Sequence, residues 1–596
     1  MKKKLLRLLP FAAVLLTASC MDKQYDLSNI NTESRFAAKG LVVPLNMSPI
    51  KLSNIISIEE DGDIQKDADG NYYFKKVGKE PFKSEDVKVE KITITKPNDI
   101  SQSVTVTVTL DPDIQNNWNT HAPGMTIKQI KDAGLSSAVG FDDDPEIFSV
   151  TINESNTTIN LKNPDDKLID SKITGINKLG LDPLPMNLDI RLGALNNVVN
   201  KVNISDLEVA LPSGMTIQEA DVYNSENGEL KYNALEVSVG TPKTIATVTG
   251  LDCNAMGTNL FNKSTHKFTY SKECSISGTA KIKVSDLSDN TTLSDITAGA
   301  TSCTCVVNFS NDLVINSFSG DIEYTLDNDI SIDPVDIENL PEILQESGTS
   351  IELANPQLYL VNVSNPFVTN NIKPEAVLSI TGNNTYKATL KLNKANNNIL
   401  MSPEYADLWD NTFKQEDWVD FDGLGGLLSG DKIPATLTIK VEKPVLNATN
   451  VENFELGKDH PGITGNWKFY TKLALTDKTK ISYNKVWDDW GSEDLDGLTV
   501  EKATVSFDFK KDVALDAKSI EFFLHGKEGK LYGITNNVKG DANVITIEMT
   551  GRPVSNITGG ELKVKLEGQG KGINTTQQIE VSNLRMTVDG YYDKKF

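Results

Sequence analysis

"VTVTVTL" (residues 104–110) alternates apolar and polar residues without interruption. Successive side chains of a β-strand point to opposite faces, so this alternation predicts a strand with one face in a core and the other in water. The same alternation returns in FSVTINES (148–155), YTLDNDISI (324–332), ATLTIKVEK (435–443), ATVSFDFKK (503–511), VITIEMTG (544–551) and ELKVKLEG (561–568). These stretches are short and separated by clusters of Gly, Asn, Asp and Pro. We therefore expect a mainly β protein of several consecutive antiparallel β-sandwich (Ig-like) domains.

Helical signals are few and short. "MTIKQIKDAGL" (125–135) carries a glycine near its end, "PEILQESG" (341–348) begins with proline and ends with glycine, and "PEYADLW" (403–409) begins with proline. Proline in the first turn and glycine after the last turn are common helix boundaries. We predict that these three stretches are connector helices across the ends of sandwiches.

Polar, turn-rich stretches divide the chain into candidate domains. At roughly 150 residues per domain, the length corresponds to about four domains. The predicted units are a signal peptide (1–19), a lipidated flexible tether (20–39), one or more N-terminal β domains (40–200), a β-sandwich with a cysteine cluster (201–334), a β-sandwich (335–445) and a C-terminal β domain (446–596).

The N-terminus has the parts of a secretory signal peptide: a basic start, an apolar run over Leu8–Leu16 and the small residues Ala18 and Ser19. "LTASC" (16–20) resembles the lipobox of bacterial lipoproteins. This resemblance implies that the Cys20 thiol carries a diacylglycerol and that acyl chains such as palmitate complete the anchor. No stretch after Cys20 reaches the roughly 18 apolar residues of a membrane-spanning helix, so we expect the lipid to be the sole anchor.

The residues after Cys20 indicate to which membrane the lipoprotein is sent. Met21 stands where an Asp commonly retains such lipoproteins at the inner membrane, and "DKQYD" (22–26) resembles a mild form of the acidic signal of Bacteroidetes surface lipoproteins. "YDLSNINTE" (25–33) and "KGLVVPLNMSPIKLSNI" (39–55) resemble the N-termini of large Bacteroidales-type surface lipoproteins. Both resemblances imply a lipid-anchored protein of the outer membrane, at the cell surface. The choice between its periplasmic and extracellular faces stays open.

The chain is strongly acidic. Its formal charge is −23, and removal of residues 1–19 takes away four positive charges and leaves −27. A chain of this charge repels nucleic acids and anionic headgroups, so we expect neither as a partner. The expected partners are the membrane, through the lipid anchor, and a polysaccharide or another surface protein.

Four cysteines remain besides the anchor: Cys253, Cys274, Cys303 and Cys305. An even number clustered in an exported protein predicts one or two disulfides. Cys303 and Cys305 would lie ~6.6 Å apart on one face of a strand. That spacing is near the upper limit for a direct bridge, so pairing with Cys253 and Cys274 is favoured. The alternatives are a zinc site, which lacks the usual C-x-x-C pair, and free thiols in an anaerobic host.

Two acidic, tryptophan-rich stretches are the candidate ligand-binding segments. "EYADLWDNTFKQEDWVDFDG" (404–423) contains Trp409 and Trp418, and "KVWDDWGSEDLDG" (485–497) contains Trp487 and Trp490. Tryptophan faces beside carboxylates can hold sugars, because C–H groups stack on the ring and the acids accept hydroxyl hydrogen bonds. The alternative is that the rings plug the ends of sandwiches while the acids remain in water.

Calcium is a third interpretation of the second stretch. Carboxylates are suitable Ca²⁺ ligands, and the weak candidates are Asp488, Asp489, Glu493, Asp494 and Asp496. The stretch "DADGNYYF" (67–74) starts like a calcium loop but lacks its glycine and its final acid in either frame. It predicts a β-hairpin that turns at Asp69-Gly70. We expect no resident cofactor other than, in this one stretch, Ca²⁺.

Signatures of catalysis are absent from the sequence. His121, His266, His460 and His525 form no H-E-x-x-H motif, and the chain has no G-x-S-x-G elbow, phosphate-binding loop or dinucleotide-binding fingerprint. We expect no enzyme, although paired carboxylates leave a glycan-degrading hydrolase as a remote alternative.

These observations favour a surface lipoprotein with a non-catalytic binding or structural role, of which glycan capture is the most concrete version. The main alternative is an adhesion or assembly subunit that resembles the fimbrillin-type lipoproteins. Such proteins mature by cleavage after an arginine near the N-terminus, and Arg35 is the residue at the matching place. The alternative is that Arg35 is not a cleavage site but an ordinary residue of the tether.

Overall fold

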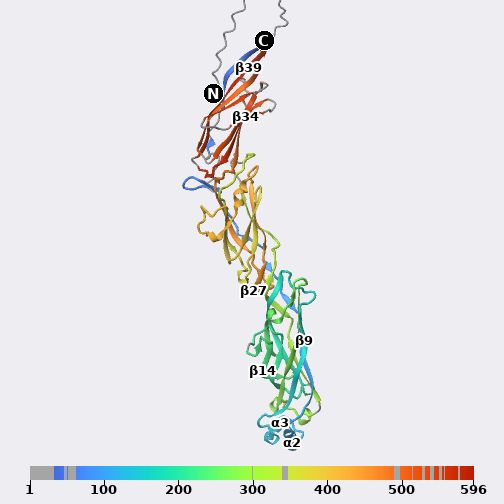
Figure 1. Ribbon diagram of the computed structural model, residues 1–596. Coiled ribbons are helices and arrows are strands. Elements are labelled where there is room, and N and C mark those ends of the chain that lie inside the picture. Colours follow the sequence, from blue (N-terminus) through green and yellow to red (C-terminus); the bar gives the residue numbers. More distant parts are fainter. Residues whose placement is uncertain are drawn as a thin grey trace, which may run out of the picture.

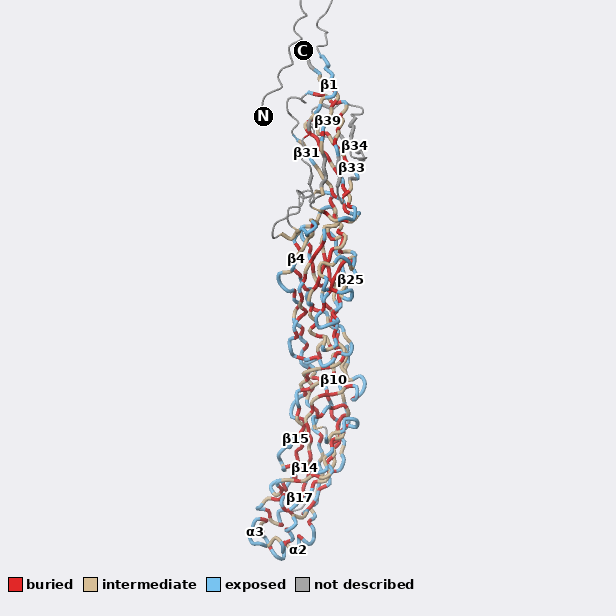
Figure 2. The backbone as a smooth tube through the Cα atoms, turned by 90° about the vertical axis from the view of Figure 1, so that its left-hand side faces the viewer, coloured by how far each residue is buried: buried red, intermediate tan, exposed pale blue. Residues whose placement is uncertain are grey.

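The computed structural model describes residues 33–45, 50–51, 62–219, 221–297, 300–337, 346–488, 497–512, 515–526, 531–536, 542–548, 554–555, 557–574 and 577–595. The protein is a long rod made of antiparallel sheets with a few short helices, so the predicted fold class is confirmed. Figure 1 shows both chain ends at one end of the rod and helices α2 and α3 at the other. Figure 2 shows buried residues along the interior of the rod.

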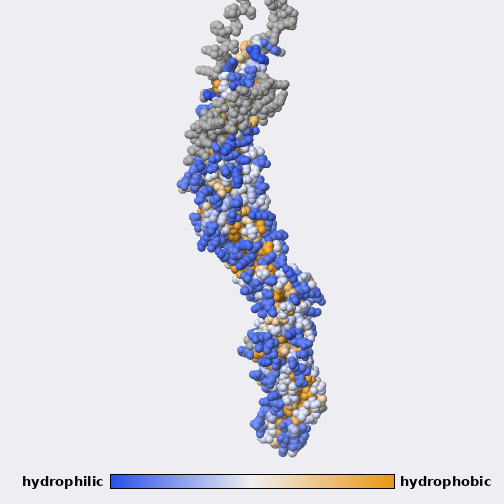
Figure 3. Space-filling view, in the orientation of Figure 1, coloured by the Kyte–Doolittle hydropathy of each residue, from blue (hydrophilic) through white to orange (hydrophobic). Residues whose placement is uncertain are grey.

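Three sandwich-like bodies follow one another along the rod, and each pairs a larger sheet with a smaller one around its own apolar core. We name them by their described residues: the root body (within 33–51 and 477–595), the middle body (within 62–85, 327–445 and 461–475) and the distal body (within 87–326 and 446–460). The root body lies next to the chain ends and the distal body carries the helices. The visible face is largely hydrophilic, with hydrophobic patches near mid-length (Figure 3).

The distal body holds the largest core, between its two sheets. Its larger sheet contains β7 (Ile92–Ile94), β8 (Ile100–Thr107), β10 (Ile173–Arg191), β12 (Met215–Ile217), β15 (Lys243–Asp252), β18 (Ala300–Phe309), β19 (Leu313–Ile322) and β27 (Ala448–Glu455). Its smaller sheet contains β9 (Glu146–Lys162), β11 (Lys201–Ala210), β13 (Tyr223–Asn224), β14 (Glu229–Ser238), β16 (Phe261–Asn262) and β17 (Lys267–Lys283). A separate ladder joins β6 (Val87–Lys88) to β28 (Asp459–His460).

The middle body carries the candidate site. Its larger sheet contains β3 (Ile64–Lys66), β4 (Tyr72–Val77), β5 (Phe82–Lys83), β21 (Gln357–Ser364), β24 (Asn396–Ser402), β25 (Trp418–Asp420) and β29 (Thr464–Lys472). Its smaller sheet contains β20 (Ile330–Asp336), β22 (Glu375–Thr381), β23 (Thr385–Lys391) and β26 (Thr436–Val445). The hairpin predicted at Asp69-Gly70 is confirmed, because β3 pairs with β4.

The root body joins the two ends of the chain. Its larger sheet contains β1 (Glu33–Pro44), β2 (Ile50–Lys51), β32 (Leu498–Asp512), β35 (Ala542–Glu548), β36 (Val554–Ser555) and β39 (Gln578–Lys595). Its smaller sheet contains β31 (Lys480–Trp487), β33 (Leu515–Gly526), β34 (Leu531–Asn536) and β37 (Ile557–Gly568). The ladder of β30 (Ala474–Leu475) with β38 (Lys571–Gly572) links the root body to the end of the middle body.

The chain runs out along the rod and returns. Its first 110 residues supply β1 to the root body, β4 to the middle body and β8 to the distal body, and later segments pair with each of them. Individual sheets therefore contain strands from both sides of the domain boundaries predicted near residues 40, 200, 334 and 445. Whether the predicted segments fold as separate domains stays a prediction. Residues 33–38, expected to belong to the end of a flexible tether, are paired with β39.

The helices include α2 (Pro112–His121), α3 (Ile127–Asp132), α4 (Ser136–Val139), α5 (Cys253–Met256) and α6 (Leu293–Ile296), with the short 3₁₀ helices η2 (Gly193–Leu195), η3 (Val284–Asp286), η4 (Val368–Asn370), η5 (Gln415–Asp417) and η6 (Asp422–Leu428). The helix predicted within 125–135 is confirmed as α3, which a capping box of Thr126 and Gln129 starts. Residues 341–345 of another predicted helix lie outside the described residues. Among the described helices, none is long and apolar enough to cross a bilayer.

The helix predicted at 403–409 is wrong, because this stretch is an irregular loop. Two of its backbone N–H groups donate to side chains at the start of β21 and just before it: Glu404 N–H to Asn355 and Trp409 N–H to Gln357. Asp407 adopts a φ of 50°, in the left-handed region, which also breaks a helix. Tertiary hydrogen bonds thus override the local helical signal.

Candidate ligand-binding site

The loop of residues 403–417 joins β24 to β25 and covers the outer face of the larger sheet of the middle body. On that face, Tyr359 of β21 lies opposite Lys468 of β29, and Lys468 lies opposite Val77 of β4. In the next row, Tyr470 pairs with Lys75. A satellite cluster of Tyr359, Leu400, Phe413 and Tyr470 lies here, separate from the main core.

Buried polar groups of β21 hold this loop in place. Gln357 is 1% exposed, and its amide nitrogen donates to the carbonyls of Ala406 and Asp407 over 3.3 and 3.0 Å. Its amide oxygen accepts from the Trp409 backbone N–H over 3.1 Å and from the Tyr359 hydroxyl. Gln357 and Tyr359 are buried and Trp409 is half-buried, whereas Ala406 and Asp407 are exposed. Breaking these bonds would leave the buried side-chain amide of Gln357 unsatisfied. The loop is therefore a fixed part of the fold.

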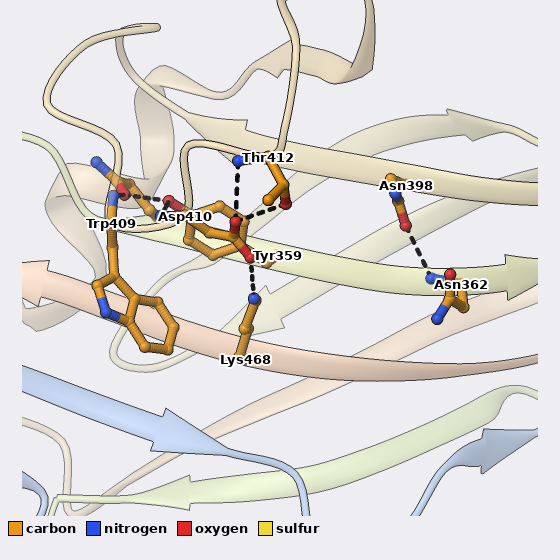
Figure 4. Close-up of polar contacts among 8 residues, drawn as sticks. Tyr359, Asn362, Asn398, Trp409, Asp410, Thr412 and Lys468 are labelled. Carbon is orange, nitrogen blue, oxygen red and sulfur yellow. Dashed lines mark hydrogen bonds and ion pairs between the residues drawn. The ribbon is translucent and has the colours of Figure 1, made fainter.

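Trp409 lines an open cleft, and Figure 4 shows its indole ring beside the strands that carry Tyr359 and Lys468. Its ring stacks on Tyr470 with 5.3 Å between centroids and 12° between planes, and it meets Tyr359 edge-on at 6.0 Å. The Trp409 side chain remains half-buried. The cleft measures about 640 Å³, and its lining residues are Tyr405, Ala406, Asp407, Leu408, Trp409, Asn411, Phe413, Tyr470 and Lys472.

The lysines around the cleft contact neighbouring acidic and aromatic groups. Lys468 forms an ion pair with Asp410, and Lys472 forms one with Asp407 at 3.5 Å. The Lys75 ammonium lies 4.9 Å from the centroid of the Trp409 ring, a cation–π contact. Asp67 interacts electrostatically with Lys472. The three lysines are thus engaged by neighbouring groups, two of them by aspartates and Lys75 by the Trp409 ring.

Protonation states at the cleft follow from burial. Burial opposes ionisation of Asp410, but hydrogen bonds from Lys468 and Thr412 outweigh it and lower the pKa of Asp410. Burial raises the pKa of Tyr470 to about 12, and neighbouring Tyr73 and Asp67 add to the shift. At neutral pH the cleft therefore offers an ionised, internally paired Asp410 and a neutral phenol under Trp409.

Trp418 supports the cleft from behind. Its indole N–H donates to the carbonyl and the hydroxyl of Ser402 over 3.2 and 3.0 Å. Its ring lies 6.3 Å from that of Tyr405, which lines the cleft, while Trp418 does not. Of the four predicted tryptophans, Trp409 is therefore the one whose ring the described structure places at an opening.

The second acidic stretch lies apart, in the root body. Trp487 is half-buried against the core of that body, 6.1 Å from the ring of Phe522. Asp488 is exposed and lies 3.9 Å from Nδ1 of His525. Trp490, Asp489, Glu493, Asp494 and Asp496 lie outside the described residues. Within the described residues, no group of three or more His, Cys, Asp or Glu is arranged to hold a metal.

The predicted disulfide is wrong. Cys253, Cys274, Cys303 and Cys305 are free and buried, and none lies at disulfide distance from another. Cys274 belongs to β17 of one distal sheet, whereas Cys303 and Cys305 belong to β18 of the other. Each packs as a small hydrophobic residue in the same core. Burial raises the pKa of Cys253 to about 12, so the thiol stays protonated and unreactive at neutral pH.

Sequence reasoning missed the residues that make Trp409 a platform, above all Tyr470, Tyr359 and Gln357. One signal was available for Tyr470: the alternation in "NWKFYTK" (466–472) puts Asn466, Lys468, Tyr470 and Lys472 on one face. The pairing of that face with residues 403–417 depends on which strands become neighbours, and no local pattern contains that information.

Comparisons with known proteins add little. No family model matches the chain, and no curated protein matches it. A solved structure from Parabacteroides distasonis, a Bacteroidales species, is of a protein described as secreted. It is 17% identical, with a TM-score of 0.29, over 46% of this chain and 89% of that one. A similarity of this size establishes neither fold nor activity for this chain.

Proposed function

We propose that this protein is a lipid-anchored cell-surface protein that binds a carbohydrate at the Trp409 cleft and catalyses no reaction. The observation that carries the proposal is the Trp409 ring, stacked flat on Tyr470 at the opening of a cleft rimmed by Asp407, Asn411 and Lys472. An aromatic face attracts the polarised C–H groups of a sugar ring, and the rim supplies hydrogen-bond acceptors and donors for hydroxyls. Such a mixture of aromatic surface and few polar groups is typical of ligand sites.

The architecture is consistent with attachment at the root. The first described residue, Glu33, pairs with Lys595, so the segment that follows Cys20 enters the fold at the end of the rod that holds both termini. A lipid on Cys20 would therefore hold the rod by its root body. The Trp409 cleft would stand away from the membrane, one body further along.

The test is binding of the mature chain to a panel of surface and dietary polysaccharides, read by affinity electrophoresis and by quenching of tryptophan fluorescence. We expect Trp409→Ala to abolish retardation in the gel. The matched control is Trp487→Ala in the root body, which should bind like the wild type. Loss of binding in the control alone would refute the assignment of the cleft. Release of reducing ends from a bound polymer would refute the non-catalytic role.

An assembly role is the second candidate, and the position of β1 favours it. This strand forms the edge of its sheet, with β39 as its neighbour. Arg35 is exposed on it, pairs with Asp593 at 2.9 Å and lies over the Tyr591 ring. Cleavage after Arg35 would leave residues 36–44 to be displaced from β39. Intact mass of the protein from cells decides: a chain that starts at acylated Cys20 contradicts this role.

A further inference from the structure

The outer face that carries the Trp409 cleft continues beyond it as a row of exposed amides. Along β29, alternation puts Asn466 on the same face as Tyr470, four residues away, which corresponds to about 13 Å in a strand. Asn466 is exposed and lies opposite Val361 of β21. Asn362 and Asn398 are exposed beside it. Figure 4 shows these two asparagines further along β21 from Tyr359 and Trp409.

The asparagine row is built into the sheet. The Asn398 side-chain oxygen accepts from the backbone N–H of Asn362 over 3.0 Å, at a bulge where Asn362 has a φ of 51°. This bond fixes the Asn398 amide plane, with its nitrogen still able to donate. Next along the strands, the hydroxyls of Ser364 and Thr464 lie 3.1 Å apart. The row thus presents uncharged donors and acceptors on fixed backbone.

An exposed apolar side chain lies between the Trp409 cleft and the asparagine row. Val77 of β4 lies opposite Lys468 and is 52% exposed, one of few large hydrophobic side chains so exposed in the described part of the chain. Exposed apolar surface between an aromatic platform and a polar row fits a ligand with alternating apolar faces and hydroxyl edges. The Lys468 ammonium beside it is already paired with Asp410, so it is not free to bind an acidic ligand.

We propose that the ligand is a neutral, linear polysaccharide that lies along β29 and β21. One sugar stacks on Trp409, a following ring contacts Val77, and the hydroxyls beyond reach Asn466, Asn398 and Asn362. This inference rests on the proposed carbohydrate function and extends it from a single sugar to a chain. The lysines beside the cleft are already engaged by Asp410, Asp407 and the Trp409 ring, which favours an uncharged polymer over an acidic one.

The experiment is calorimetry of the full mature chain with disaccharides and hexasaccharides of cellulose, xylan and mannan, and with hexagalacturonate as the charged comparison. We expect one neutral hexasaccharide to bind at least about tenfold more tightly than its disaccharide. The double variant Asn398→Ala/Asn466→Ala should lose most of this gain, since each lost hydrogen bond corresponds to about two- to tenfold in affinity. Its affinity for the disaccharide should not change. Asn119→Ala, an exposed asparagine on α2, is the matched control and should bind like the wild type.

The outcomes separate the two proposals. Equal affinity for disaccharide and hexasaccharide, still dependent on Trp409, would overturn the extended track and leave the cleft. Tighter binding of hexagalacturonate than of every neutral hexasaccharide would overturn the neutral ligand. Absence of binding to the whole panel would overturn the carbohydrate function itself. Circular dichroism of the double variant distinguishes a folding defect, and the single variant Val77→Ser then tests the track independently by the same length dependence.

Discussion

Trp409 and Trp467 lie on opposite faces of the same sheet and illustrate two uses of one residue type. Trp467 is 2% exposed in the core of the middle body, and its ring fills the space beside Gly78. Trp409 is half-buried on the outer face and stacks on Tyr470. The first ring contributes to stability through burial, whereas the second keeps part of its surface for a ligand.

Replacement by alanine should separate these two roles. We expect Trp467→Ala to lower the free energy of unfolding by about 3–5 kcal/mol, as for other fully buried aromatic rings. Trp409→Ala should cost about 1–2 kcal/mol, because it removes one stacking contact and part of the buried area. Urea denaturation measures both values. Equal losses would show that Trp409 is a structural plug.

The buried cysteines make stability sensitive to alkaline pH. Burial raises the pKa of Cys274 to about 12 and that of Cys303 to about 11, from an ordinary value of 9.0. Above pH 9 the unfolded chain releases these protons and the folded chain retains them. The free energy of unfolding therefore falls as pH rises from 9 towards 12, by up to about 1.4 kcal/mol per pH unit for each thiol. Cys274→Ala should show a shallower decline between pH 9 and 11 in urea titrations, and an unchanged slope would contradict this account.

At the scale of elements, the sequence predicts what is local. Alternation in residues 104–110 marks the edge of a core: in β8 the half-buried Val104 and Val106 alternate with exposed threonines. Thr126 and Gln129 mark the beginning of α3. The failed helix at 403–409 and the missed helix α2 show the limit. Hydrogen bonds from Gln357 hold residues 403–409 in a loop. Helix α2 is held by Trp118, which is buried in the distal core.

The candidate site was predictable in part for the same reason. Trp409 stands out as a tryptophan in an acidic loop, a local feature. Its stacking on Tyr470, and the pairing of Tyr470 with Lys75, join segments about 60 and almost 400 residues apart. Such contacts depend on the order of strands in the sheet, which alternation does not specify.

The junction of the middle and root bodies contains an apolar cavity of about 70 Å³, lined by side chains such as Val335, Ile351 and Leu475. Because an empty apolar cavity forfeits packing, we expect Val335→Ile to raise the free energy of unfolding by about 1 kcal/mol. Val209→Ile is the matched control, because Val209 is fully buried in the distal body away from this cavity. It should lower stability by about 1–3 kcal/mol through overpacking. A destabilised Val335→Ile would contradict the cavity.

At the scale of the whole molecule, the out-and-back path puts the chain ends together and the helices α2 and α3 far from them. If the acyl chains on Cys20 hold the root, Cys20→Ala should release the protein from membranes. Fractionation of cells after a high-salt wash measures this. Retention of the variant would show a second attachment.

The buried native thiols permit a test of orientation. Asn119 on α2 is exposed, and so is Glu501 in the root body. A dye attached to Glu501→Cys should transfer energy to a lipid acceptor efficiently, and the same dye on Asn119→Cys should transfer little. Labelling of Asn119→Cys on intact cells by an impermeant maleimide would place the α2 end of the rod outside the cell. Equal transfer from both sites would mean that the rod lies flat on the membrane.

The pairing of β1 with β39 has a mechanical consequence. If a cell is held through a polymer caught at the Trp409 cleft, the load passes from β4 through the N-terminal part of the chain to β1 and then to the anchor. Tension at Glu33 acts along β1, parallel to the strand, while the ladder runs from Glu33 opposite Lys595 to Pro44 opposite Arg585. The hydrogen bonds of such a ladder lie across the strands, so they resist in shear and share the force. The β1–β39 ladder would therefore keep the rod attached while a bound polymer is under drag.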